Sequence, residues 1–476
     1  MTSAAQSTRR ACIVGAGPNG LAAAITLAQH GVHVDVFEAQ PQAGGAARTL
    51  ELTMPGFLHD FGSAVHPLAA GSPFFSSLPL QAHGLQWIHP PAPLAHPLND
   101  GTAVILERDL RGAESALGRD GKRWRRLMQP FADHWSDLSA EILRPLHVLT
   151  PHPFLLARFG LVAFPSAKTL AYLFRSERTK ALFAGLAAHS FLSLDEPLSA
   201  AFGVILGVAA HAVGWPIPLG GAQSITNALC AHLASLGGTL KTSARVEDLA
   251  AFSDYDAILC DVAPHQLLRI ARSRLPARYA RRLAKYRYGP GVFKVDYALH
   301  TPIPWKAADC ARAATVHLGG SFQEIAASEY DMSHGRHPER PFVLLAQPSL
   351  FDPTRAPAGQ HIAWAYCHVP NGSTVDMLEA LESQIERFAP GFRDCILARH
   401  VFSPAALEEM DANLIGGDIS GGAMDLRQFF FRPTWRHYAT PVRNVYICSS
   451  STPPGGGVHG MCGHHAARLA ASRLSG

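Results

Sequence analysis

A glycine-rich stretch near the start of the chain limits the fold more than any other feature. Residues 11–38 read ACIVGAGPNGLAAAITLAQHGVHVDVFE, so an apolar run leads directly into Gly15, Gly17 and Gly20. A segment rich in Ala and Leu follows, and a second apolar run ends on Glu38. A strand, a glycine turn, a helix and a second strand in this order predict a βαβ unit that binds a dinucleotide.

The residues of this turn have separate physical tasks. Gly15 permits the tight turn, Gly17 lets the backbone approach a pyrophosphate, and Gly20 lets the helix pack against the strand. Pro18 and Asn19 start the helix whose N-terminus faces the anion, and we count them among the cofactor-binding residues.

The second strand ends in an acid that bears on the choice of dinucleotide. Glu38, followed by Ala39, can accept hydrogen bonds from ribose hydroxyls, and its charge disfavours a ribose 2′-phosphate. We assign both residues to the cofactor site. The motif alone does not distinguish FAD from NAD.

Composition excludes several classes of protein. The 476 residues are 47% hydrophobic and 16% charged, which indicates a globular protein of two or three domains or one composite domain. A net charge of +4 gives no electrostatic support for binding nucleic acid. The eight cysteines form no Cys-x-x-Cys pair, which favours buried reduced thiols in an intracellular protein.

The N-terminal residues and one apolar segment bear on localisation. The first strand follows the N-terminus without an apolar signal region, so secretion is not expected. Residues 198–221 are the most apolar segment, but His211 and Pro216 interrupt it, and a buried helix is the favoured interpretation. We expect a cytoplasmic protein and leave open a peripheral contact with membrane.

The stretch after Glu38 carries a family resemblance. Residues 39–48, AQPQAGGAAR, place Gly44, Gly45 and Ala46 before Arg48. This resembles the GG-x-x-R extension of the flavin-dependent amine oxidase and phytoene desaturase superfamily. The resemblance implies that the cofactor is FAD, that this backbone approaches it and that Arg48 lies close to it. Only one dinucleotide fingerprint occurs, so no separate NAD domain is expected.

Two later stretches carry the same resemblance. Residues 214–249 are similar to a P-x-GG, helix, strand unit that returns the chain to the FAD domain, with Val246 beside the adenine. Residues 444–474 resemble the closing strand, Gly-rich turn and last helix, whose N-terminus meets the N1–C2=O edge of the flavin. The cofactor-binding residues that this implies are Gly456, Gly457, Val458, His459 and Met461.

Further segments, among them GPGVFKVDYAL and GGDISGGAMDLRQFFFRPTW, resemble one subgroup. It is the phytoene-desaturase-like NAD(P)/FAD-dependent oxidoreductases, which include relatives of pyridine nucleotide-disulfide oxidoreductase domain-containing protein 2. The implied fold is α/β, with a discontinuous Rossmann-type FAD-binding domain and an inserted mixed α+β substrate domain. The FAD-binding domain comprises 1–85, 215–285 and 415–476, and the substrate or capping domain 86–214 and 286–414.

Patterns within the inserts suggest their secondary structure. Residues 122–214 are largely helical by pattern, with prolines at 151, 153 and 165 as interruptions. Residues 286–402 mix strand-like runs with one helix, for which Ser373 is the expected N-cap and Pro390-Gly391 the end.

Lys294 is the first candidate for catalysis. It interrupts an apolar strand, where burial without a partner is costly, and Asp296 lies on the same side of that strand. Amine oxidases carry a lysine in a similar strand, and the resemblance implies that Lys294 holds water or oxygen at the flavin N5. A lysine that only extends its charge to the surface is the alternative.

Histidines supply the other two candidates. Residues 55–67 contain His59, Asp60 and His66, but adjacent residues of a strand point to opposite faces, so we do not expect a metal site. His66 is a candidate active-site residue. In the C-terminal loop His459 is a candidate for proton transfer, whereas His464 and His465 diverge on one helix and cannot chelate together.

These features lead to a hypothesis with alternatives. We expect an FAD-dependent oxidoreductase that abstracts hydride from an apolar, isoprenoid or lipid-like substrate, with oxygen or a quinone as electron acceptor. The alternatives are an isomerase in which FAD moves a double bond without net redox change, an amine oxidase, and a flavin-stabilised interaction protein without turnover. The substrate and the oligomeric state stay open.

Overall fold

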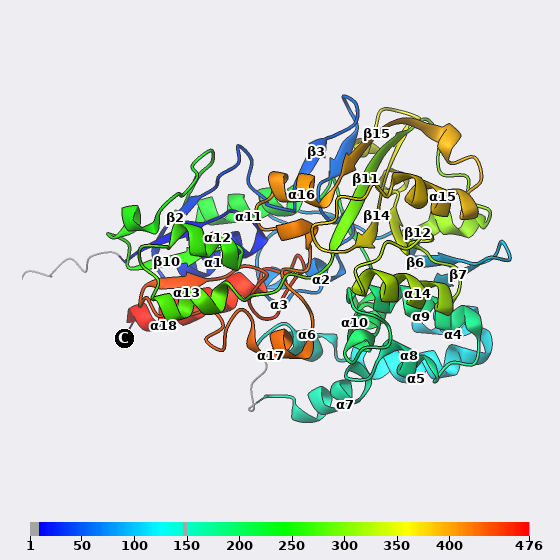
Figure 1. Cartoon of the computed structure of the whole chain (residues 1–476), viewed down its shortest axis with the longest axis horizontal. Helices are drawn as coiled ribbons and strands as arrows, with labels where there is room; N and C mark the ends of the chain where they lie inside the picture. The colour runs from blue at the N-terminus through cyan, green and yellow to red at the C-terminus, as the bar shows by residue number, and fades with distance from the viewer. Residues whose placement is uncertain (1–8, 146–149, 476) are drawn as a thin grey trace, which may run out of the picture.

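The computed structural model describes residues 9–145 and 150–475 of the chain. Two β-sheets dominate it, one towards each end of the long axis (Figure 1). The outermost residues of the predicted FAD-binding domain, 1–8 and 476, lie outside the described residues.

The first sheet is parallel and has five strands, in the order β16-β10-β1-β2-β9. It confirms the Rossmann-type α/β fold that the glycine motif predicts. Its strands come from three separated parts of the chain: β1 (Arg10–Val14), β2 (His33–Phe37), β9 (Thr239–Lys241), β10 (Ala257–Cys260) and β16 (Val445–Ile447).

Helices cover both faces of this sheet because its strands are apolar on both sides. One face packs against α1 (Pro18–Gln29), α11 (Gln223–Ser235) and α18 (Met461–Ser475). The other face packs against α12 (Pro264–Ile270) and α13 (Ala277–Leu283). Side chains alternate along β1, so Ile13 lies in the first core and Cys12 in the second.

The second sheet has seven strands, in the order β15-β11-β14-β13-β12-β6-β7, antiparallel except between β12 and β6. The strands are β6 (Ala92–Pro97), β7 (Ala103–Leu106), β11 (Gly291–Leu299), β12 (Ala313–Leu318), β13 (Val343–Ala346), β14 (His361–Val369) and β15 (Ile396–Phe402). One face packs against α15 (Leu378–Phe388), and the other faces a helical layer that includes α5 (Gly121–Ala132), α9 (Glu177–Ala188) and α10 (Ser199–Ala212).

Two short strand pairs lie outside these sheets. β3 (Thr49–Glu51) pairs with β4 (Leu58–Asp60), and β5 (Trp87–Ile88) pairs with β8 (Ile217–Pro218). In the second pair, β5 lies where the chain passes from the first sheet to the second, and β8 lies where the chain returns to the first sheet. The residue limits of the two domains stay a prediction.

The remaining α-helices are α2 (Pro67–Ala70), α3 (Pro73–Ser76), α4 (Leu110–Ala116), α6 (Trp135–Ile142), α7 (Pro153–Ala163), α8 (Ala167–Ala171), α14 (Phe322–Ser333), α16 (Pro404–Met410) and α17 (Leu426–Phe431).

Two expected elements differ from the sequence patterns. The strand expected over 239–246 ends at Lys241, because Ser243 adopts a positive φ of 51° and turns the chain. The helix expected after Ser373 begins at Leu378, because the Ser373 hydroxyl accepts a hydrogen bond from the Val375 amide in a local turn.

Pro153 begins α7 instead of interrupting a helix, since its ring fits the first helical turn.

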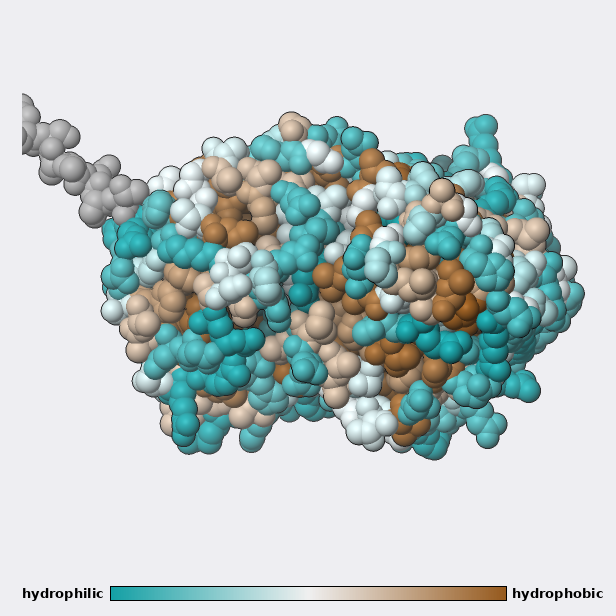
Figure 2. Space-filling view, turned by 90° about the horizontal axis from the view of Figure 1, so that it is seen from above, coloured by the Kyte–Doolittle hydropathy of each residue, from teal (hydrophilic) through white to brown (hydrophobic). Residues whose placement is uncertain are grey.

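Within the apolar segment 198–221, residues Ser199–Ala212 form α10, which is buried against the seven-stranded sheet, and a buried helix was expected there. No helix among the described residues is long and apolar enough to cross a bilayer. Exposed apolar side chains lie instead on and near α7, where Phe154 and Leu161 are 90% and 78% exposed. On the face drawn in Figure 2, apolar side chains are interspersed with hydrophilic ones. All eight cysteines are unpaired, and all but the half-buried Cys230 are buried.

Candidate functional site

A cavity of 440 Å³ extends from the carboxyl ends of the parallel strands to the inner face of the seven-stranded sheet. Its dinucleotide end is lined by the β1–α1 turn, the end of β2 and the loop after β10. This is the edge at which open parallel sheets bind ligands. Its other end, which we call the chamber, is lined by strands of the second sheet and by α10.

The β1–α1 turn has the geometry of a phosphate-binding loop. Gly15 adopts a φ of +99°, and its amide donates to the Phe37 carbonyl at 2.8 Å. A Cβ on Gly20 would lie 2.0 Å from the Gly15 carbonyl oxygen, so only glycine lets α1 begin this close to the strand. Gly17, the N-cap residue of α1, has no side chain that could bind the first amides of the helix, and it lines the cavity.

Glu38 and Arg48 hold the backbone around this turn. The Glu38 carboxylate accepts hydrogen bonds from the amides of Ala16 and Gln40, both at 2.8 Å. The Arg48 guanidinium donates to the Gly45 carbonyl at 2.7 Å and lies over the ring of Phe61. Both side chains line the cavity while they fix its shape.

Asp261 is a site residue that our sequence analysis missed. It follows β10, and its carboxylate accepts a hydrogen bond from the Gly20 amide at 2.7 Å. Burial raises the pKa of Asp261 to about 8, and the negative charges of Asp411 and Glu38 act in the same direction. The sequence signal that could have identified Asp261 is its position at the carboxyl end of a predicted parallel strand, because ligands bind at that edge of such a sheet.

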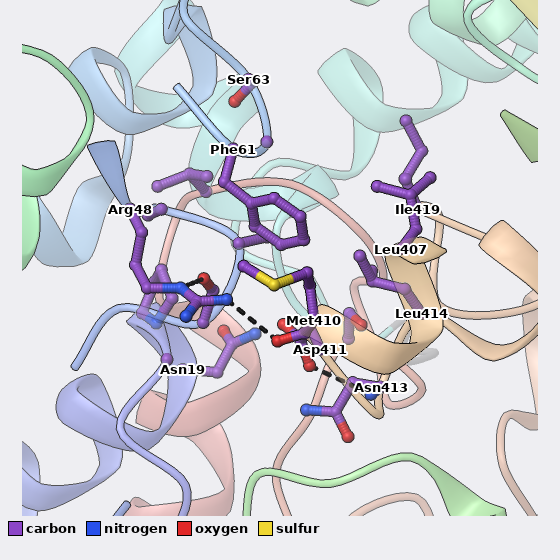
Figure 3. A pocket seen from close by; sticks show the side chains of 18 of the residues that line it. Asn19, Arg48, Phe61, Ser63, Leu407, Met410, Asp411, Asn413, Leu414 and Ile419 are labelled. Atoms are coloured by element: carbon purple, nitrogen blue, oxygen red, sulfur yellow. Dashed lines mark hydrogen bonds between the residues drawn. The ribbon is translucent and has the colours of Figure 1, made fainter. Parts of the chain in front are cut away.

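A segment from the other part of the molecule covers the dinucleotide end. Figure 3 shows Met410, the last residue of α16, and Asp411 and Asn413, which follow it, opposite Arg48 and Asn19. Arg48 donates to the Met410 carbonyl at 3.0 Å, and the Asn413 amide group donates to the Asp261 carbonyl at 3.1 Å. No sequence motif marks this segment, which we call the 409–414 cover.

The C-terminal loop contributes backbone to the cavity. Gly457 and Val458 line it, and Gly457 adopts a φ of +127° that side chains rarely tolerate. His459 does not line the cavity. It is 1% exposed, and its Nδ1 accepts a hydrogen bond from the Met461 amide at 3.0 Å, at the start of α18.

The neighbouring histidines of α18 have separate partners, as the helical divergence predicts. His464 Nδ1 lies 3.0 Å from the Thr26 hydroxyl, and His465 Nε2 lies 3.0 Å from the Leu143 carbonyl. No group of three or more His, Cys, Asp or Glu side chains within 9–145 and 150–475 is arranged to hold a metal ion.

Lys294 lies at the chamber wall, on β11. It is 3% exposed, and its ammonium group donates a hydrogen bond to Asp296 Oδ2 on the same face of the strand. The alternative of a lysine extended to the surface is therefore wrong for this chain. The pairing with Asp296 explains how the charge is tolerated, because the carboxylate compensates for the lost water.

His66 also lies at the cavity wall. Burial lowers the pKa of His66 to about 4, so the ring is neutral at neutral pH. Its Nδ1 lies 3.4 Å from the Ser63 hydroxyl, and its buried Nε2 has no hydrogen-bond partner among the described residues. A neutral imidazole of this kind can donate or accept one hydrogen bond to a ligand.

The chamber floor is one face of the second sheet. Side chains alternate along β14, so Trp364 and Tyr366 both point to the cavity, and Tyr366 is paired in register with Lys294 and Leu344. The chamber therefore combines a broad apolar and aromatic surface with a few polar atoms. Other residues that line it are Leu68, His189, Leu206, Trp215, Val292, Thr315, Leu407 and Ile419.

Most of the predicted site residues meet at this one cavity, although their roles stay predictions. Those that line it are Gly15, Gly17, Pro18, Asn19, Glu38, Ala39, Gly45, Ala46, Arg48, His66, Val246, Lys294, Gly457 and Val458. Those behind its wall are Gly20, Gly44, Gly456, His459 and Met461. Gly44 and Gly456 have close contacts that a side chain would disturb: an added Cβ would lie 2.9 Å from the Ala47 oxygen and 2.7 Å from the Ser420 oxygen, respectively.

Comparisons with known proteins agree with this architecture. Residues 13–75 match the NAD(P)-binding Rossmann-like domain family. Pyridine nucleotide-disulfide oxidoreductase domain-containing protein 2 of Rattus norvegicus is 26% identical, over 96% of this chain and 92% of that protein. Phytoene dehydrogenase of Streptomyces griseus is 25% identical, over 98% of this chain and 94% of its own length.

Solved structures share the fold. A variant of putrescine oxidase superposes with a TM-score of 0.63 at 16% identity, covering 98% of this chain and 99% of that one. The resemblance found in the sequence is thus confirmed: over nearly its whole length, the chain is similar to pyridine nucleotide-disulfide oxidoreductase domain-containing protein 2 and to a phytoene dehydrogenase.

Proposed function

We propose that the chain is an FAD-dependent oxidoreductase that removes hydride from a carbon atom of an apolar substrate. One observation carries the proposal: a single cavity joins a dinucleotide-binding turn to a chamber of apolar and aromatic side chains. A redox enzyme needs this continuity, because hydride moves only between atoms in contact.

The residues present fit FAD. The N-terminus of α1 and the turn at Gly15 and Gly17 would hold the pyrophosphate, and Glu38 has lone pairs left for ribose hydroxyls. The carbonyl oxygen of the Asn19 side chain is buried at the cavity without a partner among the described residues. The Arg48 side chain and the Gly457 backbone would contact the rest of the cofactor.

When bound, FAD supplies a two-electron acceptor for hydride. The residues of the chain do the remaining work. The 409–414 cover and the helical layer exclude water from the cavity, and the sheet floor holds the substrate against the cofactor's side. The Lys294 ammonium group lies at the chamber wall and can donate a proton. The Nε2 atom of the neutral His66 ring can form one hydrogen bond with a ligand.

The lining of the chamber favours an apolar substrate, which agrees with the name of the phytoene dehydrogenase relative. An amine oxidase is the alternative that the putrescine oxidase fold suggests. The cavity-lining carboxylates disfavour it, because Glu38, Asp261, Glu409 and Asp411 belong to the dinucleotide end or its cover. The described chamber therefore has no anionic group directed at a substrate ammonium.

An anaerobic reduction screen tests this function. The purified protein, with its flavin, is mixed with extracted lipids and isoprenoids, and loss of the visible flavin absorbance is followed. We expect bleaching by an apolar compound and formation of its desaturated product. A folded protein that neither contains flavin nor binds it would overturn the proposal.

The other outcomes of the screen separate the alternatives. Sustained turnover without oxygen or another acceptor would indicate a double-bond isomerase. Hydrogen peroxide produced from amines would indicate an amine oxidase. Flavin that stays oxidised with every donor while a partner protein co-purifies would indicate an interaction protein. Oxygen and a quinone are compared as acceptors in the same assay.

A peripheral membrane contact accompanies the proposal, since apolar substrates reside in lipid. The exposed Phe154 and Leu161 on α7, with Tyr172 nearby at 76% exposure, support it. Flotation with liposomes tests it, and serine at positions 154 and 161 should abolish co-flotation. Wild-type protein that stays at the bottom of the gradient would remove this part of the proposal.

A further inference from the structure

A row of polar side chains connects the chamber wall with the surface of the molecule. It begins at Lys294, whose ammonium group is bound to Asp296 Oδ2. It continues to His59 on β4, and His59 Nε2 lies 2.8 Å from the hydroxyl of Thr53. Lys294, Asp296 and His59 are buried, whereas Thr53 is half-exposed.

The step between Asp296 and His59 is the unusual one. The remaining carboxylate oxygen, Asp296 Oδ1, lies 3.7 Å from His59 Nδ1, and neither atom has a hydrogen-bond partner among the described residues. Buried polar atoms without partners are rare, and here two of them face each other. A small side-chain rotation or one water molecule closes this gap, so the row becomes continuous.

Neighbouring charges keep the row separate from the rest of the core. Asp60 is bound at 2.8 Å to Arg355 and receives hydrogen bonds from Thr49 and the Ala222 amide, so it takes no part. His400 lies opposite Asp296 on β15 and is half-exposed. The charged and titratable groups that face the row are thus the Asp60–Arg355 ion pair and His400.

We propose that Asp296, His59 and Thr53 form a proton path between Lys294 at the chamber wall and the surface. The inference rests on the proposed function. Conversion of a CH–CH unit to C=C releases one hydride and one proton, and the hydride goes to the cofactor. The proton has to leave the chamber, whose lining is mostly apolar and aromatic.

The path accepts that proton in successive transfers between neighbouring groups. Lys294 gives one ammonium proton to the Asp296 carboxylate and takes the proton of the substrate in its place, so the pair gains one proton, which Asp296 holds. Asp296 gives it to His59 Nδ1 while His59 Nε2 releases a proton towards Thr53. Because His59 exchanges one ring proton for the other, it ends as the opposite neutral tautomer.

The acidities of the two central groups agree with these tasks. Burial raises the pKa of Asp296 to about 6, against the opposing effect of Lys294. Burial lowers the pKa of His59 to about 3, so His59 carries the proton only in passage. A carboxyl group that titrates near neutral pH can both take and give a proton during turnover.

Reoxidation of the reduced protein by oxygen tests the path without knowledge of the substrate. Transfer of hydride to oxygen consumes one proton (O2 + H⁻ + H⁺ → H2O2), so the same path runs in reverse. The holoprotein is photoreduced without oxygen and mixed with aerated buffer from roughly pH 5 to 9 in H2O and D2O. The return of the flavin absorbance gives the rate.

We expect the wild-type rate to fall as the pH rises through the range in which Asp296 loses its proton, and to be slower in D2O. Asp296→Asn and His59→Gln should slow reoxidation about tenfold or more at the acidic end and remove this pH dependence. Thr53→Val, at the half-exposed end, should slow it while leaving the core intact. Tyr297→Phe, on the opposite face of β11, is the matched control and should behave as wild type.

A second readout does not depend on turnover. In the 15N-histidine-labelled protein, the ring signals of His59 are identified by their loss in His59→Gln. Asp296→Asn should shift these signals, and Tyr297→Phe should not. The path is refuted if the three path variants retain bound flavin and are reoxidised as Tyr297→Phe is, and if Asp296→Asn leaves the His59 ring signals unshifted. Absence of flavin from the wild-type protein would instead overturn the proposed function.

Discussion

Gly463 on α18 lies against the backbone of Asn19 on α1, so closely that a Cβ at position 463 would lie 1.8 Å from the Asn19 carbonyl oxygen. This contact joins the last helix of the chain to the helix of the dinucleotide turn. The two helices therefore approach each other at the distance that only a missing side chain allows.

Gly463→Ala should for this reason destabilise the protein. We expect a loss of about 1–3 kcal/mol in the free energy of unfolding, because the two helices must move apart. Urea denaturation measures it. Gly160→Ala is the matched control: Gly160 also lies in a helix, but nothing lies within 4 Å of an added Cβ, so alanine should stabilise that helix. Equal effects of the two substitutions would contradict the prediction.

Gly20→Ala should abolish cofactor binding. Its Cβ would overlap the Gly15 carbonyl oxygen and push the turn out of shape, whereas the core of the sheet would remain. The ratio of flavin to protein after purification gives the result, and far-ultraviolet circular dichroism checks that the fold persists. A variant with normal secondary structure and a full complement of flavin would show that the turn does not depend on this contact.

Asp261→Asn should change how stability depends on pH. Burial raises the pKa of Asp261 from its usual 3.8 to about 8, so between these values the folded state holds a proton that the unfolded state has released. Stability from this group is fully present at low pH and is lost as the pH rises towards 8, by at most about 1.4 kcal/mol per pH unit. Asparagine at position 261 does not titrate, so the variant should not lose stability in this way as the pH rises.

Denaturant unfolding of wild type and Asp261→Asn at several pH values gives the comparison. The variant should gain stability relative to wild type as the pH increases, since asparagine still accepts the hydrogen bond from Gly20. A stability difference that does not change with pH would mean that Asp261 is not held in its protonated form.

His459→Ala should affect stability and leave the chemistry unchanged. It removes the acceptor for the Met461 amide at the start of α18, which costs about 1–2 kcal/mol. The rate of reoxidation by oxygen should stay as in wild type, because His459 does not line the cavity. His459→Asn, which keeps a short acceptor, should lose less stability. A normal stability with an altered rate would restore the catalytic hypothesis for His459.

The sequence predicts those parts of the site in which backbone geometry demands one residue type. Gly15 and Gly20 are readable because a tight turn and a close helix leave no room for a side chain, and Glu38 is readable from its place at a strand end. The C-terminal Gly457 belongs to the same class. These positions are local in sequence, so their spacing carries the information.

The chamber could not be predicted in this way. Tyr366 and Trp364 reach it only because β14 pairs with β11, more than sixty positions away in the chain at each register pair. Asp411 covers the dinucleotide end through a loop without any motif. Asp296 was noticed beside Lys294, but its relation to His59 depends on the packing of β4 against the second sheet, which no local pattern encodes.

The cavity is walled by two structural units that come from different sheets. Its cofactor end depends on glycines, whose replacement breaks a turn, whereas its floor consists of side chains on regular strands, which can be exchanged without moving the backbone. Substitutions at Val292, Thr315, Leu344 and Tyr366 can therefore alter what the enzyme accepts while cofactor retention is preserved. Such a division lets related proteins diverge in substrate while one inherited redox centre persists, and it marks these four positions as the place to begin directed evolution.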